Sequence, residues 1–253
     1  MNALFGTKHI ILIVLSLILF AVGYIFSRKL SFKSMTRLML YIGIVSETIK
    51  IFYYITRNES THGGVLPKTD LPFHLCSIQI LFILLLNIVD NKKLHDLLIS
   101  FMMPSCLIGG FAAILIATDS SRNGMWIITL QYFVYHVSIM VYALYLATDR
   151  VHSPSLKGYF SCLKMLLGIM FFSIYINSVL YDGVSNINFM YVVGPPQDGL
   201  PFLNDNNGWL SYILRYAAVI LFSVTLFYIK PIVKSVFSIG KKKEEAEKEL
   251  VTK

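Results

Sequence analysis

The stretch LPFHLCSIQI, residues 71–80, carries the side chains with the clearest chemical capacity in this sequence. It contains His74, Cys76 and Ser77, and nucleophilic catalysis needs a thiol or hydroxyl beside a base such as imidazole. Positions 74 and 76 lie about 200° apart on a helix, so His74 cannot readily serve Cys76 within one helix. Ser77 is within reach of His74, whereas Cys76 is left to pair with another helix or to pack.

A second histidine, His136, lies in the middle of a long apolar run. An imidazole at that depth in a membrane needs a partner, which makes it a candidate functional group. Two histidines from different helices, His74 and His136, could act on one substrate, one as nucleophile or base and the other as acid. The nucleophile stays open among the two histidines, Cys76 and Ser77.

Other polar side chains also fall within apolar segments, where a charged group costs several kcal/mol. Glu47 and Lys50 are three residues apart, and such a pair either serves a site or neutralises itself as a structural pair. At 1.5 Å per residue, Glu47 and His136 both fall about 15 Å from the same membrane boundary. We therefore predict Glu47, His74 and His136 as the catalytic residues. The predicted substrate-binding residues are Lys50, Cys76, Gln79, Gln131, Asn177, Arg215 and Trp209, although Arg215 could instead reach the headgroups.

The cysteines and histidines do not have the spacing of a metal site. Cys76, Cys106 and Cys162 lack a CxxC arrangement. His74 and His136 lack third and fourth ligands in any recognisable spacing. We predict neither a metal nor a cofactor.

The elements that position these side chains are predicted to be membrane-spanning helices. Of the 253 residues, 56% are hydrophobic and 14% charged, whereas soluble domains are about 45–50% apolar. A bilayer core about 30 Å thick needs roughly 20 apolar residues as a helix. The sequence therefore predicts an all-α, polytopic seven-transmembrane-helix bundle. The predicted helices are residues 8–27, 37–57, 72–90, 96–117, 126–148, 158–181 and 209–230, with an outer lid loop at 182–208 in a membrane domain 1–238.

The basic residues predict the orientation of this bundle. Lysines and arginines gather after the first, third and fifth helices and in the tail 239–253, whereas 182–208 has none. Loops rich in lysine and arginine stay cytoplasmic, so the N-terminus is expected outside and the charged tail inside the cell membrane. This distribution also explains the net charge of +8 without a nucleic-acid partner.

Several motifs together resemble the YwaF-like family of bacterial seven-helix membrane proteins. They are LPFHLC before the third helix, SETIKIFYY in the second, the histidine in QYFVYHVSIMVYALYL, and NINFMY and LNDNNGWLSYIL before the last helix. Eukaryotic relatives of the transmembrane protein 164 type are regarded as acyltransferases that move fatty acyl chains between glycerophospholipids. The resemblance implies lipid acyl transfer here, with membrane lipids as substrates.

The residues around the histidine depart from the eukaryotic pattern. That pattern has its proposed cysteine nucleophile directly before the histidine, as Pro-Cys-His, whereas this sequence has Pro72-Phe73-His74. The resemblance therefore carries over the histidine, as His74, but no cysteine nucleophile. The lid loop likewise keeps Trp209 but has VVGPPQDG where bacterial members carry a lysine, which leaves the headgroup preference open.

Two functions fit these observations. The first is a lipid acyltransferase with its active site in the outer half of the bundle. The alternative is a transporter or solute-binding membrane subunit, in which Pro104, Gly109 and Gly110 would break the fourth helix and Glu47 would carry protons. Few polar residues continue toward the cytoplasmic side and no internal repeat is visible, so we favour the enzyme. The sequence does not predict the oligomeric state.

Overall fold

A computed structural model describes residues 4–56, 66–118, 121–122, 124–148, 151–195 and 203–238, and their principal elements are helices. The long helices are α1 (Thr7–Ser27), α2 (Phe32–Thr56), α3 (Leu75–Ile88), α4 (Lys92–Leu115), α6 (Trp126–Leu146), α7 (Leu156–Leu180) and α8 (Trp209–Phe227). Two short 3₁₀ helices, η1 (Lys68–Asp70) and η2 (Phe189–Tyr191), lie in the loops. A further helical segment occupies residues 229–238.

Six of these helices are long and apolar enough to cross a membrane, namely α1, α2, α4, α6, α7 and α8. The seventh predicted span, α3, has 14 residues. It begins at Leu75 and not at residue 72, because His74 is extended and serves as the N-cap. The rings of Phe73 and His74 pack against Phe189, at 5.4 and 5.1 Å between centroids, and these contacts hold the segment in a non-helical path.

Two helices begin earlier than their apolar residues indicate. α2 begins at Phe32, five residues before the predicted start, and Ser31 accepts a hydrogen bond from the Ser34 N–H. α4 begins at Lys92, and its N-cap Asn91 accepts from the Leu94 N–H. Capping side chains satisfy N–H groups that lack partners in the helix, so a polar first turn becomes helical where hydropathy predicts loop.

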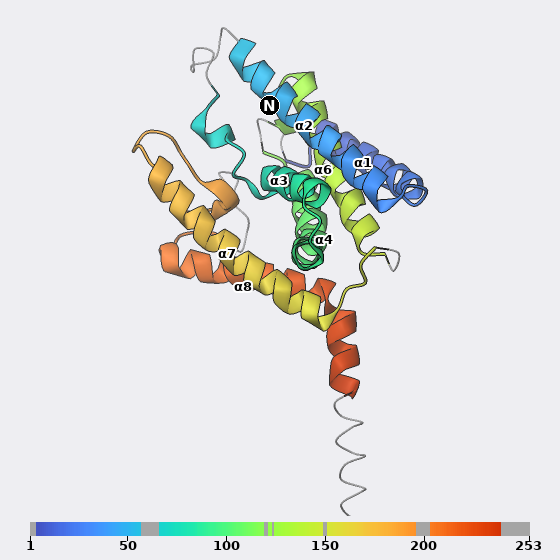
Figure 1. Ribbon diagram of the computed structural model, residues 1–253. Helices are drawn as coiled ribbons and strands as arrows, with labels where there is room; N and C mark the ends of the chain where they lie inside the picture. The colour runs from blue at the N-terminus through green and yellow to red at the C-terminus, as the bar shows by residue number, and fades with distance from the viewer. Residues whose placement is uncertain are drawn as a thin grey trace, which may run out of the picture.

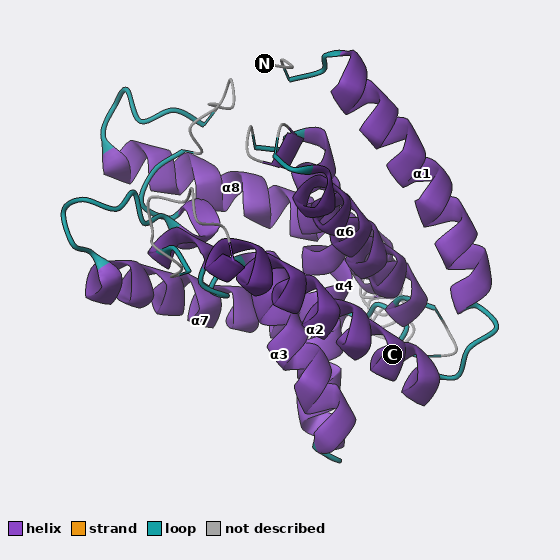
Figure 2. Ribbon diagram, turned by 90° about the horizontal axis from the view of Figure 1, so that it is seen from above, coloured by secondary structure: helices purple, strands orange, loops and turns teal. Residues whose placement is uncertain are grey.

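The core of the bundle is formed by α4 and α6, which share the most extensive contact between two helices. α1 packs on α6, and α2 packs on both α6 and α3. α7 and α8 both contact α4, on the side opposite α1 (Figures 1 and 2). Large apolar side chains such as Ile18, Phe171 and Phe222 are exposed on the outer helices, as expected for surfaces in contact with lipid tails.

The close approach of α4 and α6 depends on Gly110. A Cβ atom at this position would lie 2.9 Å from the carbonyl oxygen of His136 and 2.6 Å from Met140 Cγ. α4 also remains one continuous helix through Pro104. The packing of α4 therefore fixes the part of α6 that carries His136.

Candidate functional site

The centre of the candidate site is a contact between Cys76 of α3 and His136 of α6. The Cys76 Sγ and His136 Nε2 atoms are 3.1 Å apart. His136 Nδ1 lies 2.7 Å from the carbonyl oxygen of Tyr132, which can only accept, so Nδ1 carries a proton. In the neutral ring Nε2 is then unprotonated and accepts the hydrogen bond of the thiol. This is the arrangement of a nucleophile and its general base.

The imidazole of His136 is fixed by its surroundings. Its residue is 5% exposed, and the ring of Tyr132 packs against it at 4.2 Å between centroids. Tyr135 donates its hydroxyl hydrogen to the Cys76 carbonyl oxygen at 2.7 Å. Tyr132 and Tyr135, which are not among the predicted site residues, thus fix the positions of the imidazole and of the Cys76 backbone.

Cys76 is the second residue of α3, at the positive end of the helix. The first backbone bond within the helix runs from the Ile78 N–H to the His74 carbonyl oxygen, so the N–H groups of residues 75–77 precede the helical ladder. The side chain of the N-cap, His74, does not cap them. Backbone N–H groups at a helix N-terminus stabilise negative charge on a thiolate or an oxyanion.

Charged residues of α2 adjoin this turn. Lys50 Nζ lies 2.8 Å from Glu47 Oε2, with the two side chains 16% and 19% exposed. Ser77 donates its hydroxyl hydrogen to Glu47 Oε1 at 3.0 Å. The structure thus brings the predicted residues Glu47, Lys50, His74, Cys76 and His136 around the start of α3.

His74, which was predicted as a catalytic residue, does not lie beside the Cys76 thiol. Its Nε2 donates to the carbonyl oxygen of Thr69, 3.3 Å away. Its ring packs on Phe189 and Tyr191 of the lid loop, at 5.1 and 6.1 Å. His74 therefore lies between the first turn of α3 and the lid, whereas the imidazole next to the thiol is that of His136.

The lid loop is held in a strained conformation. Met190 and Tyr191 are consecutive non-glycine residues with φ of 56° and 54°, and each such residue costs about 1–3 kcal/mol. The Met190 carbonyl oxygen accepts from the Tyr216 hydroxyl at 2.8 Å, and that of Tyr191 accepts from the Tyr212 hydroxyl at 2.5 Å. Hydroxyls of α8 therefore compensate the strain.

Two predicted substrate-binding residues contact this same backbone. Asn177 accepts from the Phe189 N–H at 2.7 Å and donates to the Phe189 carbonyl oxygen at 3.1 Å. Trp209 donates its indole N–H to the Val192 carbonyl oxygen at 2.9 Å. Both side chains position the lid, because their polar atoms are engaged with it.

Arg215 also contacts the lid loop, at its far end. Its guanidinium donates to the Asn204 backbone carbonyl oxygen at 2.7 Å, and its Nε donates to the Ser211 carbonyl oxygen at 3.1 Å. Pro196 and the rest of residues 196–202 lie outside the described part of the chain, as does the predicted tail 239–253.

A salt bridge ties the lid to the loop before α3. Lys68 Nζ lies 2.7 Å from Asp182 Oδ2. The Asp182 carboxylate also accepts from the N–H groups of Ser185 and Val184 and from the Ser185 hydroxyl. Hydrogen bonds from Lys68 and from these groups hold the pKa of Asp182 well below its usual range.

The two predicted glutamines form hydrogen bonds to different helices, Gln79 to α4 and Gln131 to α2. Gln79 is fully buried one turn after Cys76 and donates to the Ser105 hydroxyl oxygen at 3.1 Å. Gln131 donates to the Ser46 hydroxyl oxygen at 2.6 Å and links α6 to α2.

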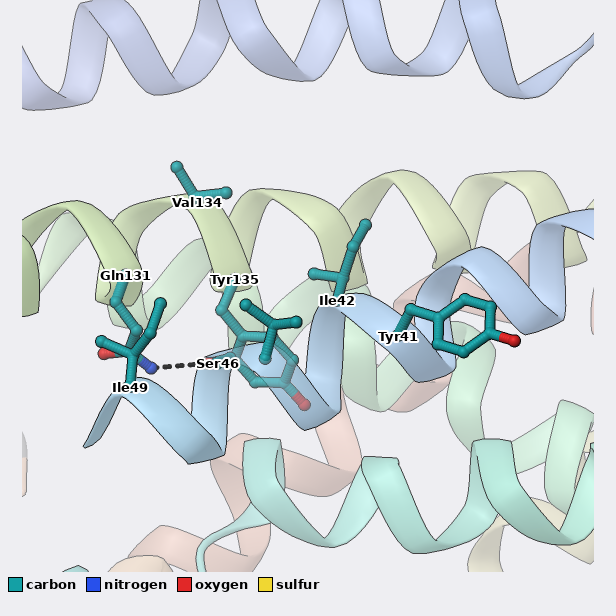
Figure 3. Close-up of a pocket in the computed structure, with 8 residues that line it drawn as sticks. Tyr41, Ile42, Ser46, Ile49, Gln131, Val134 and Tyr135 are labelled. Carbon is teal, nitrogen blue, oxygen red and sulfur yellow. Dashed lines mark hydrogen bonds between the residues drawn. The ribbon is translucent and has the colours of Figure 1, made fainter. Parts of the chain in front are cut away.

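An apolar groove of about 280 Å³ runs between α2 and α6 beside that link (Figure 3). Tyr135, which bonds to the Cys76 carbonyl, forms one wall of it. Val45 of α2, which is 56% exposed, also lines it. The complete lining is Tyr41, Ile42, Val45, Ser46, Ile49, Gln131, Val134 and Tyr135. The groove therefore places an apolar surface next to the residues that hold the thiol.

Among the described residues, no group of three or more histidine, cysteine or acidic side chains has the geometry of a metal site.

The chain matches a known protein family. The model of the TMEM164 family matches residues 4–228 of the chain, which includes every helix that contributes to the site. This confirms the relation to transmembrane protein 164 indicated by the motifs. No curated protein and no solved structure matches the chain.

Proposed function

This chain belongs to the TMEM164 family, and from that premise we propose that it is a membrane-embedded lipid acyltransferase with Cys76 as nucleophile and His136 as general base. The observation that carries the proposal is the 3.1 Å contact between Cys76 Sγ and His136 Nε2. The matching eukaryotic pattern has its cysteine at the position of Phe73. The proposal therefore keeps cysteine chemistry but moves the thiol three residues along the chain.

In the first half-reaction, a glycerophospholipid donates its acyl group to the thiol. The Cys76 S–H proton passes to His136 Nε2 as the sulfur attacks the ester carbonyl carbon. N–H groups at the start of α3 stabilise the tetrahedral oxyanion. The C–O bond then breaks, and the leaving glycerol oxygen takes the proton from His136. The products are a lysophospholipid and an acyl thioester on Cys76.

In the second half-reaction, the hydroxyl of an acceptor lysolipid attacks the thioester. Its proton passes to His136 Nε2, a new C–O bond forms, and the C–S bond breaks. The Cys76 thiolate then recovers the proton from the imidazolium. The reaction exchanges one oxygen ester for another and needs no cofactor.

The groove between α2 and α6 supports the proposal, because an acyl chain needs an apolar path to the thiol. Its walls open on the membrane-facing side of α2, where Tyr41 and Val45 are 64% and 56% exposed. A lipid tail could therefore enter sideways from the bilayer. The Lys50 ammonium, beside Glu47, is a candidate contact for the lipid phosphate.

The proposal includes a seven-span topology with the N-terminus outside the cell membrane. α3 is about 21 Å long by helical rise, shorter than the bilayer core of about 30 Å. In the segment before α3, Phe73 and His74 pack against Phe189 of the lid loop, and non-helical backbone at membrane depth is tolerated where protein covers it. This arrangement would place the strained lid and Cys76 in the outer half of the membrane.

A transporter is a weaker alternative for this structure. It would require a broken helix at the substrate site, whereas α4 is continuous through Pro104 to Leu115. The half-buried Glu47 is already engaged by Lys50 and Ser77.

The test is acyl transfer by the purified protein in nanodiscs, with a labelled phospholipid donor and a lysophospholipid acceptor. We expect an acyl adduct on Cys76 that mass spectrometry locates. Cys76→Ala should abolish transfer, and His136→Ala should slow it about 10²- to 10⁴-fold, the usual contribution of a general base.

Cys162→Ala is the matched control, because Cys162 is also a free cysteine but is buried on α7. It should keep full activity. His74→Ala tests the competing assignment and should retain the adduct on Cys76. Full turnover in Cys76→Ala, with the protein folded, would disprove the proposed nucleophile.

A further inference from the structure

The last described helical segment follows α8 after a break of one residue. α8 has 19 residues and is therefore about 28 Å long, close to the thickness of the bilayer core. Its end at Phe227 thus falls near a membrane surface, and the chain becomes helical again at residues 229–238.

The residue at this break, Tyr228, is fixed to the bundle. It is fully buried, and its hydroxyl donates to the Ser100 carbonyl oxygen of α4 at 2.7 Å. Its ring packs on Tyr159 of α7 at 5.7 Å between centroids. Tyr159 in turn hydrogen-bonds with Thr225 of α8 at 3.0 Å. The direction in which segment 229–238 leaves the bundle is therefore set by buried contacts.

Segment 229–238 has two chemically distinct faces. Its sequence is IKPIVKSVFS. At 100° per residue, the apolar positions cover one continuous arc of about 140°, and the other positions cover the opposite side. The apolar positions are Ile229, Ile232, Val233, Val236 and Phe237. The other face consists of Lys230, Pro231, Lys234, Ser235 and Ser238. Around the helix, no polar position falls within the apolar arc and no apolar position falls within the polar arc.

The apolar face is largely uncovered by the described part of the chain. Ile232 packs against the core, but Ile229, Val233, Val236 and Phe237 are 47%, 42%, 64% and 70% exposed. Figure 1 shows the segment projecting from the end of the bundle, beyond α8. Exposed apolar surface of this kind, next to a membrane-spanning helix, favours contact with the bilayer.

The opposite face is positively charged. Lys230 and Lys234 are both exposed, and the sequence continues with Lys241–Lys243. α4, to which Tyr228 is bonded, begins with Lys92 and Lys93. An amphipathic helix with lysines on its polar face lies in the plane of a membrane surface and is attracted by anionic lipids.

We propose that residues 229–238 form a surface anchor that lies on the adjoining leaflet, with its apolar face among the lipid tails and Lys230 and Lys234 against anionic headgroups. The lipid surface is the favoured partner because the buried Tyr228 links the helix directly to the membrane-spanning α8. The helix therefore stays beside the bilayer and contacts it without first having to diffuse to it. The inference does not depend on acyl transfer.

The test uses the full-length protein in nanodiscs, with p-benzoylphenylalanine in place of Phe237 as a photoactivated probe. Ser238, the next residue and on the opposite face, is the matched control position. Mass spectrometry after illumination should find lipid adducts at position 237 and few at 238. Equal lipid adducts at both positions, or adducts mainly to a second copy of the chain, would overturn the proposal.

The charge is tested in the same assay. Lipid adducts at position 237 should increase when phosphatidylglycerol is added to phosphatidylcholine nanodiscs. Lys230→Gln with Lys234→Gln should remove this increase, since each lysine near an anionic surface contributes about fivefold, or about 1 kcal/mol. An undiminished increase in the double variant would refute the role of the lysines. Both lysines are exposed, so the bundle should stay folded.

Discussion

Replacing Gly110 by alanine should impair the Cys76–His136 pair without altering either residue. The new Cβ would lie 2.9 Å from the His136 carbonyl oxygen, whereas ordinary contacts begin at 3.4 Å. α4 and α6 must therefore separate locally by about 0.5 Å. The Met140 side chain, 2.6 Å from the same Cβ, can move more easily than a helix backbone.

The expected loss of rate follows from this displacement. The thiol and the imidazole are 3.1 Å apart and belong to different helices, so a shift of α6 changes their separation directly. Since a 1 Å misplacement near a reaction centre can cost about 10²-fold, half that distance should slow acyl-enzyme formation about tenfold. Overpacking of this kind also typically lowers stability by about 1–3 kcal/mol.

Two assays separate the loss of rate from the loss of stability. The rate of labelled acyl transfer in nanodiscs measures the reaction, and the rate at which iodoacetamide alkylates Cys76 measures the activation of the thiol alone. Both rates should fall in Gly110→Ala. Thermal unfolding establishes that the protein is folded at the assay temperature.

The neighbouring glycine provides the control. A Cβ at Gly109 would have only an ordinary contact, 3.4 Å from a Leu75 methyl group, so Gly109→Ala should keep the wild-type rates. Combining Gly110→Ala with Met140→Ala removes the side-chain clash but keeps the backbone clash, and should stay slow. Wild-type alkylation and transfer in folded Gly110→Ala would refute the reasoning.

Two further predictions concern the groove and the lid. Val45→Trp should fill the groove and reduce the transfer of long acyl chains more than that of short ones. Ile44→Trp, at an exposed α2 position outside the groove, should not have this effect. Equal losses for all chain lengths would argue against an acyl-binding groove. Asp182→Asn should lower the unfolding temperature at neutral pH. Because Lys68 and the loop N–H groups lower the pKa of Asp182, this difference should persist above the ordinary aspartate pKa of about 4 and vanish as the pH falls through the lowered pKa. A difference that grows on acidification would contradict the assignment.

The membrane character, the long helices and the family could be predicted from the sequence because they depend on local composition and motif order. A run of about 20 apolar residues indicates a membrane-spanning helix by itself. The starts of α2 and α4 were predicted too late. Their first turns are polar, so hydropathy does not indicate a helix there, but the side chains of Ser31 and Asn91 cap the first turns and make them helical. α3 was predicted to begin three residues too early, because contacts of His74 with the lid, far along the chain, decide where this helix begins.

Among the site residues, too, local features could be predicted from the sequence, whereas contacts between distant residues could not. Cys76 and His136 could each be recognised as reactive side chains. His74 was expected to lie on the same helix as Cys76, but it is the extended N-cap of α3 and contacts the Thr69 carbonyl oxygen. The pairing of Cys76 with His136 could not be predicted, because the two residues are 60 positions apart and no spacing rule connects them. Asn177 and Arg215 were selected as polar groups in apolar segments, and Trp209 was selected from the family resemblance. A sequence does not tell whether such a group faces a ligand or a neighbouring carbonyl.

The sequence by itself thus determined that the chain is helical, lies in a membrane and carries thiol and imidazole groups within apolar segments. Composition and periodicity act over one or two helical turns, so they can be read locally. Only the tertiary structure decided that the close packing of α4 and α6 at Gly110 brings His136 to Cys76. It also decided that the polar residues of α7 and α8 hold a strained lid. These outcomes depend on distances between helices, which the sequence does not encode locally.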